Sequence, residues 1–562
     1  MAKKHIDYTN WDREDLVREI EQLRRRKKYG IVWEDKPEDV VEQCKKELPV
    51  LEEVKDKAIS NDPNKPTNLL IEGDNFHSLS VLNYTHKEKV DIIYIDPPYN
   101  TGAKDWKYNN DYVDINDMFR HSKWVSMMNN RLKLAKRLLS KKGVLICTID
   151  DNENATLGLL LQELFPDREM VGVVIVHNPA GVQGKNFSYV HEFAYFVYPK
   201  KDLFIGKTSR DKELVSPLRD WGGTSARKLA KNCFYPIIVK GGEVIGFGSV
   251  CPIDFHPKTS NVEQSDGSIL VYPVDKHGDE KKWVFGRKGV EDKKDQLFVK
   301  KLGKETVIMR RKNEFTYRTL WDDKRYYANI YGSKLLNNII SAKFTFPKSL
   351  YAVEDCIKAV IHNKNNATIL DFFAGSGTTG HAVLELNKID EGNRKFILCT
   401  NNEDNNGDGT KIATDICYPR IKKIIEGYTG IVDKKEYKPL GGNLRYFKTS
   451  FVPADPTDKN KIKLTKKATE MLCIKEDTFE EVLSKEKFKI FRNKKRHTGI
   501  IFDHLAIPEF KKEIKELNGR INVYVFSLGD DTFYEEFEDV ESKVRLSPIP
   551  EAILRVYRRI FK

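Results

Sequence analysis

Paired cysteines are what this sequence lacks most clearly. Its eight cysteines are scattered from Cys44 to Cys473, and none forms a CxxC pair or joins histidines at zinc-ligand spacing. The pattern therefore predicts neither a disulfide framework nor a metal site. Free, scattered cysteines are typical of a reduced, cytoplasmic protein, which is the location we expect.

Long apolar runs are missing as well. No stretch of about 18 apolar residues occurs, which argues against a membrane-spanning helix. The first residues, Met1 to His5, lead into charged sequence without the apolar core of a secretory signal. The chain also has no P-loop, so ATP-driven chemistry is not expected of it.

Positive charge is what the chain has in excess. Lysine and arginine number 96 against 83 acidic residues, which gives a net charge of +13 over 562 residues. This sign favours a polyanionic partner, with nucleic acid as the first candidate, although surface charge for solubility is the alternative. Hydrophobic residues make up 40% of the chain, enough for a sizeable core.

Short β-branched, apolar segments alternate with helical ones over much of the chain. The expected strands cover residues 68–71, 90–95, 143–149, 171–176, 192–197, 367–373 and 395–399. Helices are expected at residues 76–83, 119–139 and 380–387, and earlier at 10–28 and 37–57. Apolar strands that alternate with helices predict an α/β fold with a doubly wound, mostly parallel, Rossmann-like sheet.

The character of the sequence changes twice along this pattern. From Phe204 to Thr316, short apolar runs lie among glycines, prolines and charges, which indicates an inserted β-rich domain. After Tyr437 no recognisable motif appears. We therefore expect an N-terminal helical segment (1–60), two halves of one core (61–203 and 317–436), the insertion (204–316) and a C-terminal α/β domain (437–562).

A glycine-rich loop joins an expected strand to an expected helix between Asp371 and Gly380. Gly375, Gly377 and Gly380 satisfy the G-x-G-x-x-G pattern. Glycine lets the backbone turn sharply and approach a ligand, and the helix start favours an anionic group. Either a pyrophosphate or the carboxylate of a methionine moiety would suit this loop, as would a purely structural turn.

An acidic residue after the next strand would bind a ribose diol in either case. Glu403 follows the strand at 395–399 and is our first candidate, with Asn401 or Asn402 able to share the role. The loop and this residue together predict a cofactor that contains adenosine, without saying which one.

The turn Asp96-Pro97-Pro98-Tyr99 carries the most specific chemistry in the sequence. It follows the expected buried strand at 90–95, where open α/β sheets bind their ligands. The two prolines fix the backbone and remove two N–H donors. The Asp96 carboxylate and the Pro97 carbonyl could then grip both hydrogens of an exocyclic amine, while Tyr99 stacks on the base. A base must leave the duplex to reach this turn.

With these motifs in this order, the chain resembles the amino-group DNA methyltransferases, and within them the β-class adenine enzymes typified by the modification (Mod) subunits of type III restriction–modification systems. Residues 70–75, 96–102, 143–153, 191–195, 321–323, 346–350 and 371–380 resemble successive motifs of that family. In this class the catalytic motif precedes the cofactor loop, as it does here, and the resemblance spans roughly residues 10–430.

The resemblance implies S-adenosyl-L-methionine as cofactor and N6 of a flipped-out adenine in double-stranded DNA as target. The catalytic residues would be Asp96, Pro97, Pro98 and Tyr99. The cofactor residues would be Asp74, Asn75, Lys348 (near the cofactor carboxylate), Asp371, Phe373, Ala374, Gly375, Gly377, Thr378, Thr379 and Glu403. The insertion would recognise the target DNA. A homodimer and a separate helicase–nuclease restriction subunit are the partners that the resemblance implies.

Three other functions stay open at this point. They are cytosine-N4 methylation, a non-enzymatic DNA-binding subunit with a relic pocket, and a nicotinamide-dependent dehydrogenase, in which the proline turn would have no use.

Four smaller features have alternative interpretations. The pair His191-Glu192 suggests a packed histidine or acid–base chemistry, and Asp150 to Glu153 suggests a capped helix start or a metal site. Lys185 to Lys200 and Lys281 to Arg287 mix cations with aromatics, which suits DNA contacts or exposed loops.

Overall fold

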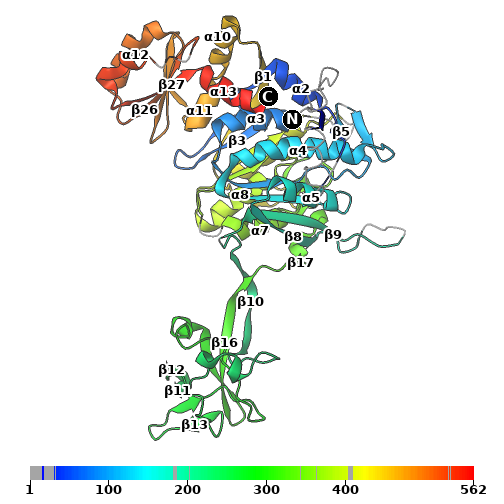
Figure 1. Cartoon of the computed structure of the whole chain (residues 1–562), viewed down its shortest axis with the longest axis vertical. Coiled ribbons are helices and arrows are strands. Elements are labelled where there is room, and N and C mark those ends of the chain that lie inside the picture. The colour runs from blue at the N-terminus through cyan, green and yellow to red at the C-terminus, as the bar shows by residue number, and fades with distance from the viewer. Residues whose placement is uncertain are drawn as a thin grey trace. The chain divides into compact units, whose positions relative to one another are not determined.

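A computed structural model describes residues 16–17, 31, 33–109, 111–181, 186–201, 203–341, 344–361, 364–402, 409–529, 531 and 533–561. The chain divides into two compact units (Figure 1). The first unit joins Met1–Gly206 to Arg318–Lys562, and the second is Lys207–Tyr317. The second unit thus lies close to the limits expected for the insertion.

One large mixed sheet forms the centre of the first unit. Its strands follow the order β1 (Glu47–Glu53), β22 (Asn443–Pro453), β3 (Thr67–Glu72), β19 (Lys395–Thr400), β18 (Thr368–Asp371), β4 (Val90–Ile95), β7 (Leu139–Ile149), β9 (His191–Pro199), β8 (Arg168–Val176) and β17 (Leu320–Trp321), with β2 (Ile59–Ser60) paired to β22. The strands from β22 to β7 are mutually parallel. The predicted, mostly parallel α/β sheet is confirmed.

Helices cover both faces of this sheet, which is why its central strands are apolar on both sides. One layer holds α3 (Asn75–Thr85), α4 (Arg120–Leu138) and α5 (Asn154–Leu164), and the other holds α7 (Leu350–Ile361), α8 (Thr378–Asp390) and α9 (Tyr418–Glu426). The first layer packs on Ile93 and Leu145, whereas α8 packs on Phe396 and Leu398. Short helices α2 (Asp39–Lys46) and α6 (Leu335–Ile339) complete the core region.

The register between β4 and β18 is fixed by polar contacts at the start of the two strands. The Asp91 carboxylate accepts a hydrogen bond from the Thr368 amide at 2.9 Å and pairs with Lys364 at 2.5 Å. Ile93 is then opposite Leu370. The sequence segments that end in Asp96 and Asp371 therefore end side by side.

Two expected boundaries were wrong. The segment 37–57 is not one helix, because α2 ends at Lys46 and β1 continues to Glu53 with Leu48, Val50 and Leu51 buried. The acidic residues of this segment made its short apolar run difficult to recognise in the sequence. Pro49 is tolerated within β1 because β1 is an edge strand. The core also extends past residue 436, because β22 lies between β1 and β3.

The C-terminal part forms a second, five-stranded sheet. Strands β23 (Glu480–Ser484), β24 (Phe488–Arg492) and β25 (His497–Ile501) are antiparallel, and β26 (Ile521–Phe526) and β27 (Val544–Ile549) continue in parallel. Helices α10 (Asp458–Lys467), α11 (Thr469–Glu476), α12 (Ile507–Lys515) and α13 (Glu551–Ile560) accompany it. Residues of α11 and α13 share a hydrophobic cluster with α3 and β1, so this sheet is built onto the core.

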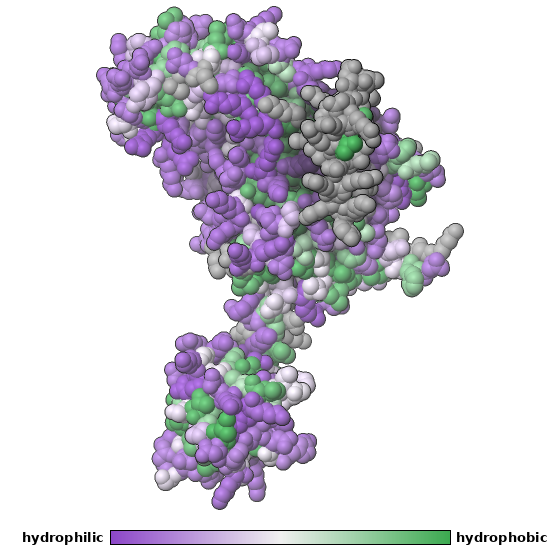
Figure 2. Space-filling view, in the orientation of Figure 1, coloured by the Kyte–Doolittle hydropathy of each residue, from purple (hydrophilic) through white to green (hydrophobic). Residues whose placement is uncertain are grey.

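The Lys207–Tyr317 unit is all β apart from short 3₁₀ turns. Strands β10 (Lys207–Pro217), β16 (Glu305–Thr316) and β15 (Leu297–Leu302) form one sheet. Strands β12 (Glu243–Phe247), β11 (Ile237–Lys240), β14 (Ile269–Val271) and β13 (Asn261–Glu263) form another. A small core around Tyr235, Trp283 and Ile308 holds them together. The visible face of this unit is mostly hydrophilic (Figure 2).

The expected N-terminal helix at 10–28 lies almost wholly outside the described residues, as does the basic run Arg24 to Lys28. Among the described helices, none is both long and apolar enough to cross a bilayer.

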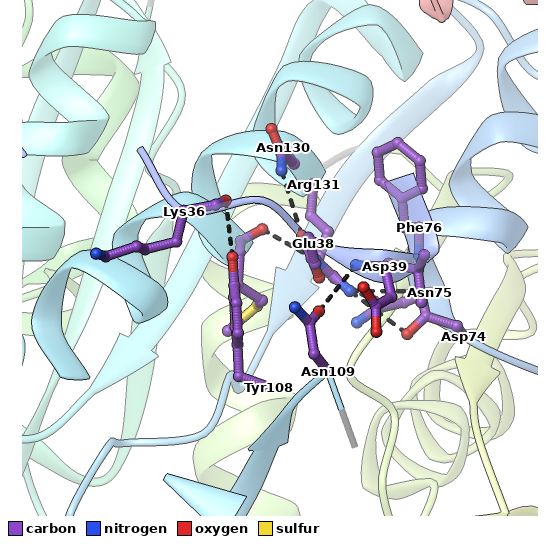
Figure 3. A network of polar contacts seen from close by, with 12 residues as sticks. Lys36, Glu38, Asp39, Asp74, Asn75, Phe76, Tyr108, Asn109, Asn130 and Arg131 are labelled. Atoms are coloured by element: carbon purple, nitrogen blue, oxygen red, sulfur yellow. Dashed lines mark hydrogen bonds and ion pairs between the residues drawn. The ribbon is translucent and has the colours of Figure 1, made fainter. Parts of the chain in front are cut away.

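A buried polar network fastens the start of α3 to α4 and to the segment before α2 (Figure 3). The Arg131 guanidinium pairs with Glu38 at 2.6 Å and with Asp74 at 3.4 Å, and its Nε donates to the Asn75 side chain. Asn130 adds a bond to Glu38 at 3.2 Å. The Arg131 and Glu38 side chains are only 5% and 6% exposed. Breaking this pair would leave a buried charge without its partner.

We expect Arg131→Met to lower the free energy of unfolding by about 3–5 kcal/mol, because Glu38 would stay buried and lose its cation. Urea unfolding followed by circular dichroism measures this loss. The double variant Arg131→Met with Glu38→Gln removes both charges and should recover part of it. An unchanged unfolding midpoint in Arg131→Met would show that the network adds nothing to stability.

Candidate active site

The two main motifs lie side by side at the carboxyl ends of the central parallel strands. Asp96 directly follows β4, and Asp371 is the last residue of β18, the neighbouring parallel strand. The carboxyl ends of parallel strands all face the same side, so the proline turn and the glycine loop share that side. β9 runs antiparallel and begins there, which adds His191 and Glu192 to the same edge.

The proline turn is braced from three sides. The Thr148 hydroxyl at the end of β7 donates to Asp96 Oδ1 at 2.6 Å, and the Trp124 indole donates to the Pro98 carbonyl at 2.7 Å. Asn100 closes the turn in the left-handed region, with φ +58°, and its amide donates to Glu153 at 2.5 Å. The backbone acceptors and the Asp96 carboxylate are thus held in fixed positions.

Tyr99 presents a half-buried ring next to Asp96. Its hydroxyl donates to Glu192 Oε2 at 2.9 Å, which fixes the ring plane. Burial, together with the charges of Asp96 and Glu192, raises the pKa of Tyr99 well above its usual value, so the hydroxyl stays protonated and serves as a donor.

Lys348, predicted to lie near a cofactor carboxylate, contacts two residues of the proline turn and Glu192. Its ammonium is 3.1 Å from Asp96 Oδ1, 3.0 Å from Glu192 Oε2 and 4.5 Å from the centre of the Tyr99 ring. Burial alone would lower the pKa of Lys348, but the two carboxylates outweigh it and raise that pKa above its ordinary value. Burial likewise opposes ionisation of Glu192, yet Lys348 and His177 hold its pKa below the usual range.

The glycine loop has the shape that a closely bound anionic group needs. Gly375 and Gly377 adopt φ +49° and +78°, a region that favours glycine. A β-carbon at Gly377 would lie 3.0 Å from the Cys417 sulfur, so the loop is also tightly packed. The Ala374 amide donates to the Cys399 carbonyl of β19 at 3.1 Å. Helix α8 then begins at Thr378, and its N-terminus suits a carboxylate.

Several predicted cofactor residues hold this loop together. The Thr379 hydroxyl and the Phe373 amide donate to the two Asp371 oxygens at 2.6 and 2.9 Å. Asp371 is buried, and burial raises its pKa to about 7, with Asp96 as a further contributor. The influence of Asp96 on the pKa of Asp371 agrees with the position of both residues at the carboxyl ends of neighbouring strands.

Asp74 and Asn75 also reach the loop region. Asp74 caps α3 by accepting from the Phe76 amide at 2.7 Å, and the Asn75 amide donates to the Phe372 carbonyl at 2.9 Å. Asn75 therefore ties the segment after β3 to the end of β18. Glu403 lies outside the described residues. Of its two neighbours, Asn402 accepts from the Thr414 amide at 3.1 Å, and the Asn401 carbonyl accepts from the Ala413 amide at 3.1 Å.

Arg420 is a residue that the sequence analysis missed. Fully buried on α9, it donates to the Thr378 hydroxyl at 2.9 Å and to the Ser376 hydroxyl at 3.1 Å. Among the described residues no carboxylate pairs with it, and its Nε has no hydrogen-bond partner. Burial lowers its pKa to about 10, which still leaves it charged. Arg420 thus adds positive potential beside the loop.

The contacts of the four smaller sequence features show which structural role their described residues have. His191 packs edge-on against Phe193, with ring centroids 5.0 Å apart. Asp150 accepts from the Asn152 amide at 2.9 Å and so caps a turn rather than the start of α5, while buried Glu153 binds Asn100 and His121. In the run Lys281 to Arg287, Lys281, Lys282 and Arg287 all form ion pairs within their own unit. Lys185 lies outside the described residues.

Comparison with known proteins places the chain in a family. The DNA methylase family matches residues 90–440. The type II methyltransferase M.KpnI of Klebsiella pneumoniae is 32% identical over 350 residues, which are 59% of this chain and 79% of that protein. The EcoPI Mod subunit of Escherichia phage P1 is 28% identical over 416 residues, 66% of this chain and 62% of that subunit. The chain therefore spans less than two thirds of that Mod subunit.

A solved structure was also found, a DNA modification methylase of Thermus thermophilus complexed with S-adenosyl-L-methionine. It is 11% identical, with a TM-score of 0.30 over 67% of this chain and 99% of that one. The matched family covers both the proline turn and the glycine loop, and it extends over well more than half of the chain. The chain belongs to the DNA methylase family, and it is an S-adenosylmethionine-dependent DNA methyltransferase.

Proposed function

We propose that the protein methylates N6 of adenine in double-stranded DNA as the modification subunit of a restriction–modification system. The observation that carries the proposal is the braced Asp96 turn next to the glycine loop, on adjacent parallel strands. Asp at the first motif position and the similarity to type III Mod subunits favour adenine over cytosine. Any ATP-driven cleavage would reside in a separate subunit, because this sequence has no P-loop.

The residues of the turn would activate the amine by accepting its two hydrogens. Asp96 and the Pro97 carbonyl draw the nitrogen lone pair out of conjugation with the ring, while Tyr99 supports the base. When bound, S-adenosylmethionine supplies an electrophilic methyl group, whose bonding pair stays on sulfur as the new N–C bond forms. The nitrogen loses one proton, which Asp96 is placed to accept.

The cofactor would lie along the glycine loop. Gly375, Gly377 and the start of α8 would face its carboxylate, with Arg420 behind them as a source of positive potential. Asp371, Phe373, Ala374, Thr378 and Thr379 shape the loop, and Asp74 and Asn75 border it. Glu403, with Asn401 or Asn402, remains our proposal for the ribose.

The Lys207–Tyr317 unit is our proposal for the DNA reader. It carries 22 lysines and arginines against 15 acidic residues, a net charge of +7. A hollow of about 200 Å³ lies beside β10, β16 and the turn before β15. It is lined by Lys207, Phe285, Lys293, Gln296, Arg310, Arg311, Lys312 and Glu314. Lys293 lies 4.3 Å from the centre of the Phe285 ring. Cations grouped around an aromatic ring suit phosphate contacts near a stacked base or sugar.

Asp96→Ala should lower the rate of methyl transfer by about a hundredfold to a thousandfold, because one of the two acceptors for the amine is lost. Incorporation of tritium from labelled cofactor into DNA measures the rate. Cofactor affinity and melting temperature should match those of the unaltered protein, which excludes misfolding. Full activity in Asp96→Ala would contradict the proposed mechanism.

The methylated base itself provides a second test. After transfer with labelled cofactor, the DNA is digested to nucleosides, which are separated by chromatography. We expect the label in N6-methyldeoxyadenosine. Label in N4-methyldeoxycytidine would contradict the adenine assignment while leaving the enzyme class intact. Single-molecule sequencing of DNA from cells that express this chain then gives the recognition sequence.

Lys293→Gln and Arg310→Gln should each weaken DNA binding and lower the slope of log affinity against log salt by about one, as expected for one lost phosphate contact. Fluorescence anisotropy over a salt series measures both quantities. Lys240→Gln is the matched control, because Lys240 belongs to the same unit but pairs with Asp266 at 3.4 Å. Equal slopes in all three variants would argue against the hollow as a phosphate site.

A further inference from the structure

The position of the Lys348 ammonium raises a question about the catalytic turn. The ammonium contacts Asp96, the residue that accepts the target amine in the proposed function, and it lies over the face of Tyr99, on which the base would stack. Both contacts are those that an adenine would make. A protonated amine at this place therefore imitates the amino group of the substrate.

We propose that Lys348 occupies the place of the target base while no base is bound, and that it withdraws to Glu192 when the base enters. The proposal rests on the proposed function, because it takes Asp96 and Tyr99 as the residues that receive the base. Lys348 is thus a positioning residue that controls access to the turn.

Glu192 is a second carboxylate to which the Lys348 ammonium binds. It is 3% exposed, and its Oε2 lies 3.0 Å from Lys348 and 2.9 Å from the Tyr99 hydroxyl. If the ammonium leaves Asp96, it can keep its bond to Glu192. The deeply buried Glu192 then keeps its cation, and only Asp96, whose side chain is 25% exposed, loses it. Movement of the ammonium then breaks one ion pair rather than two, because Glu192 keeps its positively charged partner throughout.

Two further features fit an exchange of donors at Asp96. The Thr148 hydroxyl donates to Asp96 Oδ1 at 2.6 Å, and this bond would hold the carboxylate in place when the lysine moves. Lys348 also precedes helix α7 and carries four flexible methylenes, which allow its ammonium to shift while the backbone stays in place.

This role differs from binding the carboxylate of the cofactor. Lys348 already pairs with two carboxylates, and their negative charges offset the attraction of its ammonium for a third carboxylate. Arg420, beside the glycine loop, pairs with no carboxylate among the described residues. The loop therefore has its own source of positive potential, and Lys348 is not needed there.

The test uses the full chain and a DNA duplex with 2-aminopurine next to the target adenine. The adenine thus keeps its N6 amine, and the fluorescence of its neighbour rises when the adenine leaves the stack. Lys348→Ala removes the ammonium from Asp96 and Tyr99, so we expect at least a twofold larger fluorescence increase than in the unaltered protein. In Glu192→Gln the ammonium loses its second partner and stays on Asp96, so the increase should fall. Lys348→Arg keeps a cation and should resemble the unaltered protein.

Cofactor affinity, measured by titration calorimetry, separates this proposal from the alternative. It should change less than twofold in Lys348→Ala. A tenfold or greater loss, restored in Lys348→Arg, would show that Lys348 binds the cofactor carboxylate and would overturn the proposal. An unchanged fluorescence increase in both Lys348→Ala and Glu192→Gln would overturn it as well. The double variant Lys348→Ala with Glu192→Gln removes the buried Glu192 charge together with its cation, and it tests access if Lys348→Ala fails to fold.

Failure of the proposed function has a different signature. If Asp96→Ala stays fully active, the turn does not receive the base, whatever Lys348 does. If Asp96→Ala is inactive and the 2-aminopurine signal does not respond to Lys348, only the role of the lysine is wrong.

Discussion

The pairing of β4 with β18 is the constraint on which the active site depends. The two strands come from segments 277 residues apart in the chain, yet Ile93 and Leu370 are direct neighbours. Asp91 fixes the register by binding both the Thr368 amide and Lys364. A shift by one residue would turn the buried faces of β18 over and separate Asp96 from the glycine loop. The relative position of Asp96 and the glycine loop thus depends on the Asp91 contacts at the opposite ends of the two strands.

The connection between these strands leaves the pairing undisturbed. The Lys207–Tyr317 unit starts after β9 and returns before β17, which is the last strand in the sheet order. Along the chain the insertion lies between the two strands that carry the motifs. In the sheet order, however, it follows β9 and precedes β17, so β4 and β18 remain direct neighbours. A fold with this topology can vary its inserted unit without moving Asp96 or Asp371 relative to each other.

Much of the core was predictable because its strands are apolar on both sides. The expected strands at 90–95 and 395–399 match β4 and β19 within one residue, and the expected helix at 119–139 matches α4. The edge strands were harder. β1 contains Pro49 and three glutamates, and its burial depends on β22, about 400 residues later in the chain. No local pattern reveals such a pairing.

The site shows the same division between local and long-range signals. Asp96 and the glycine loop could be predicted as parts of a candidate site because each motif is contiguous in sequence. Thr148, Glu192 and Arg420 were assigned no partner, since each acts through a residue distant in sequence. The motif at residues 346–350 predicted a role for Lys348, but the contacts of its side chain could only come from the fold. The two carboxylates that surround Lys348 lie 252 and 156 residues before it.

Electrostatics explains why Lys348 and Arg420 have different roles despite their equal charge. Lys348 is buried among anions, so its pKa is raised and its field is largely cancelled a short distance away. Arg420 is buried among hydroxyls and a histidine, so burial lowers its pKa and its field is not cancelled. An anionic ligand would gain more from the second environment. A neutral amine that needs acceptors would gain more from the first, once the ammonium has moved aside. In the proposed function, the environment of Arg420 would therefore favour the cofactor carboxylate, and the carboxylates around Lys348 would favour the amine.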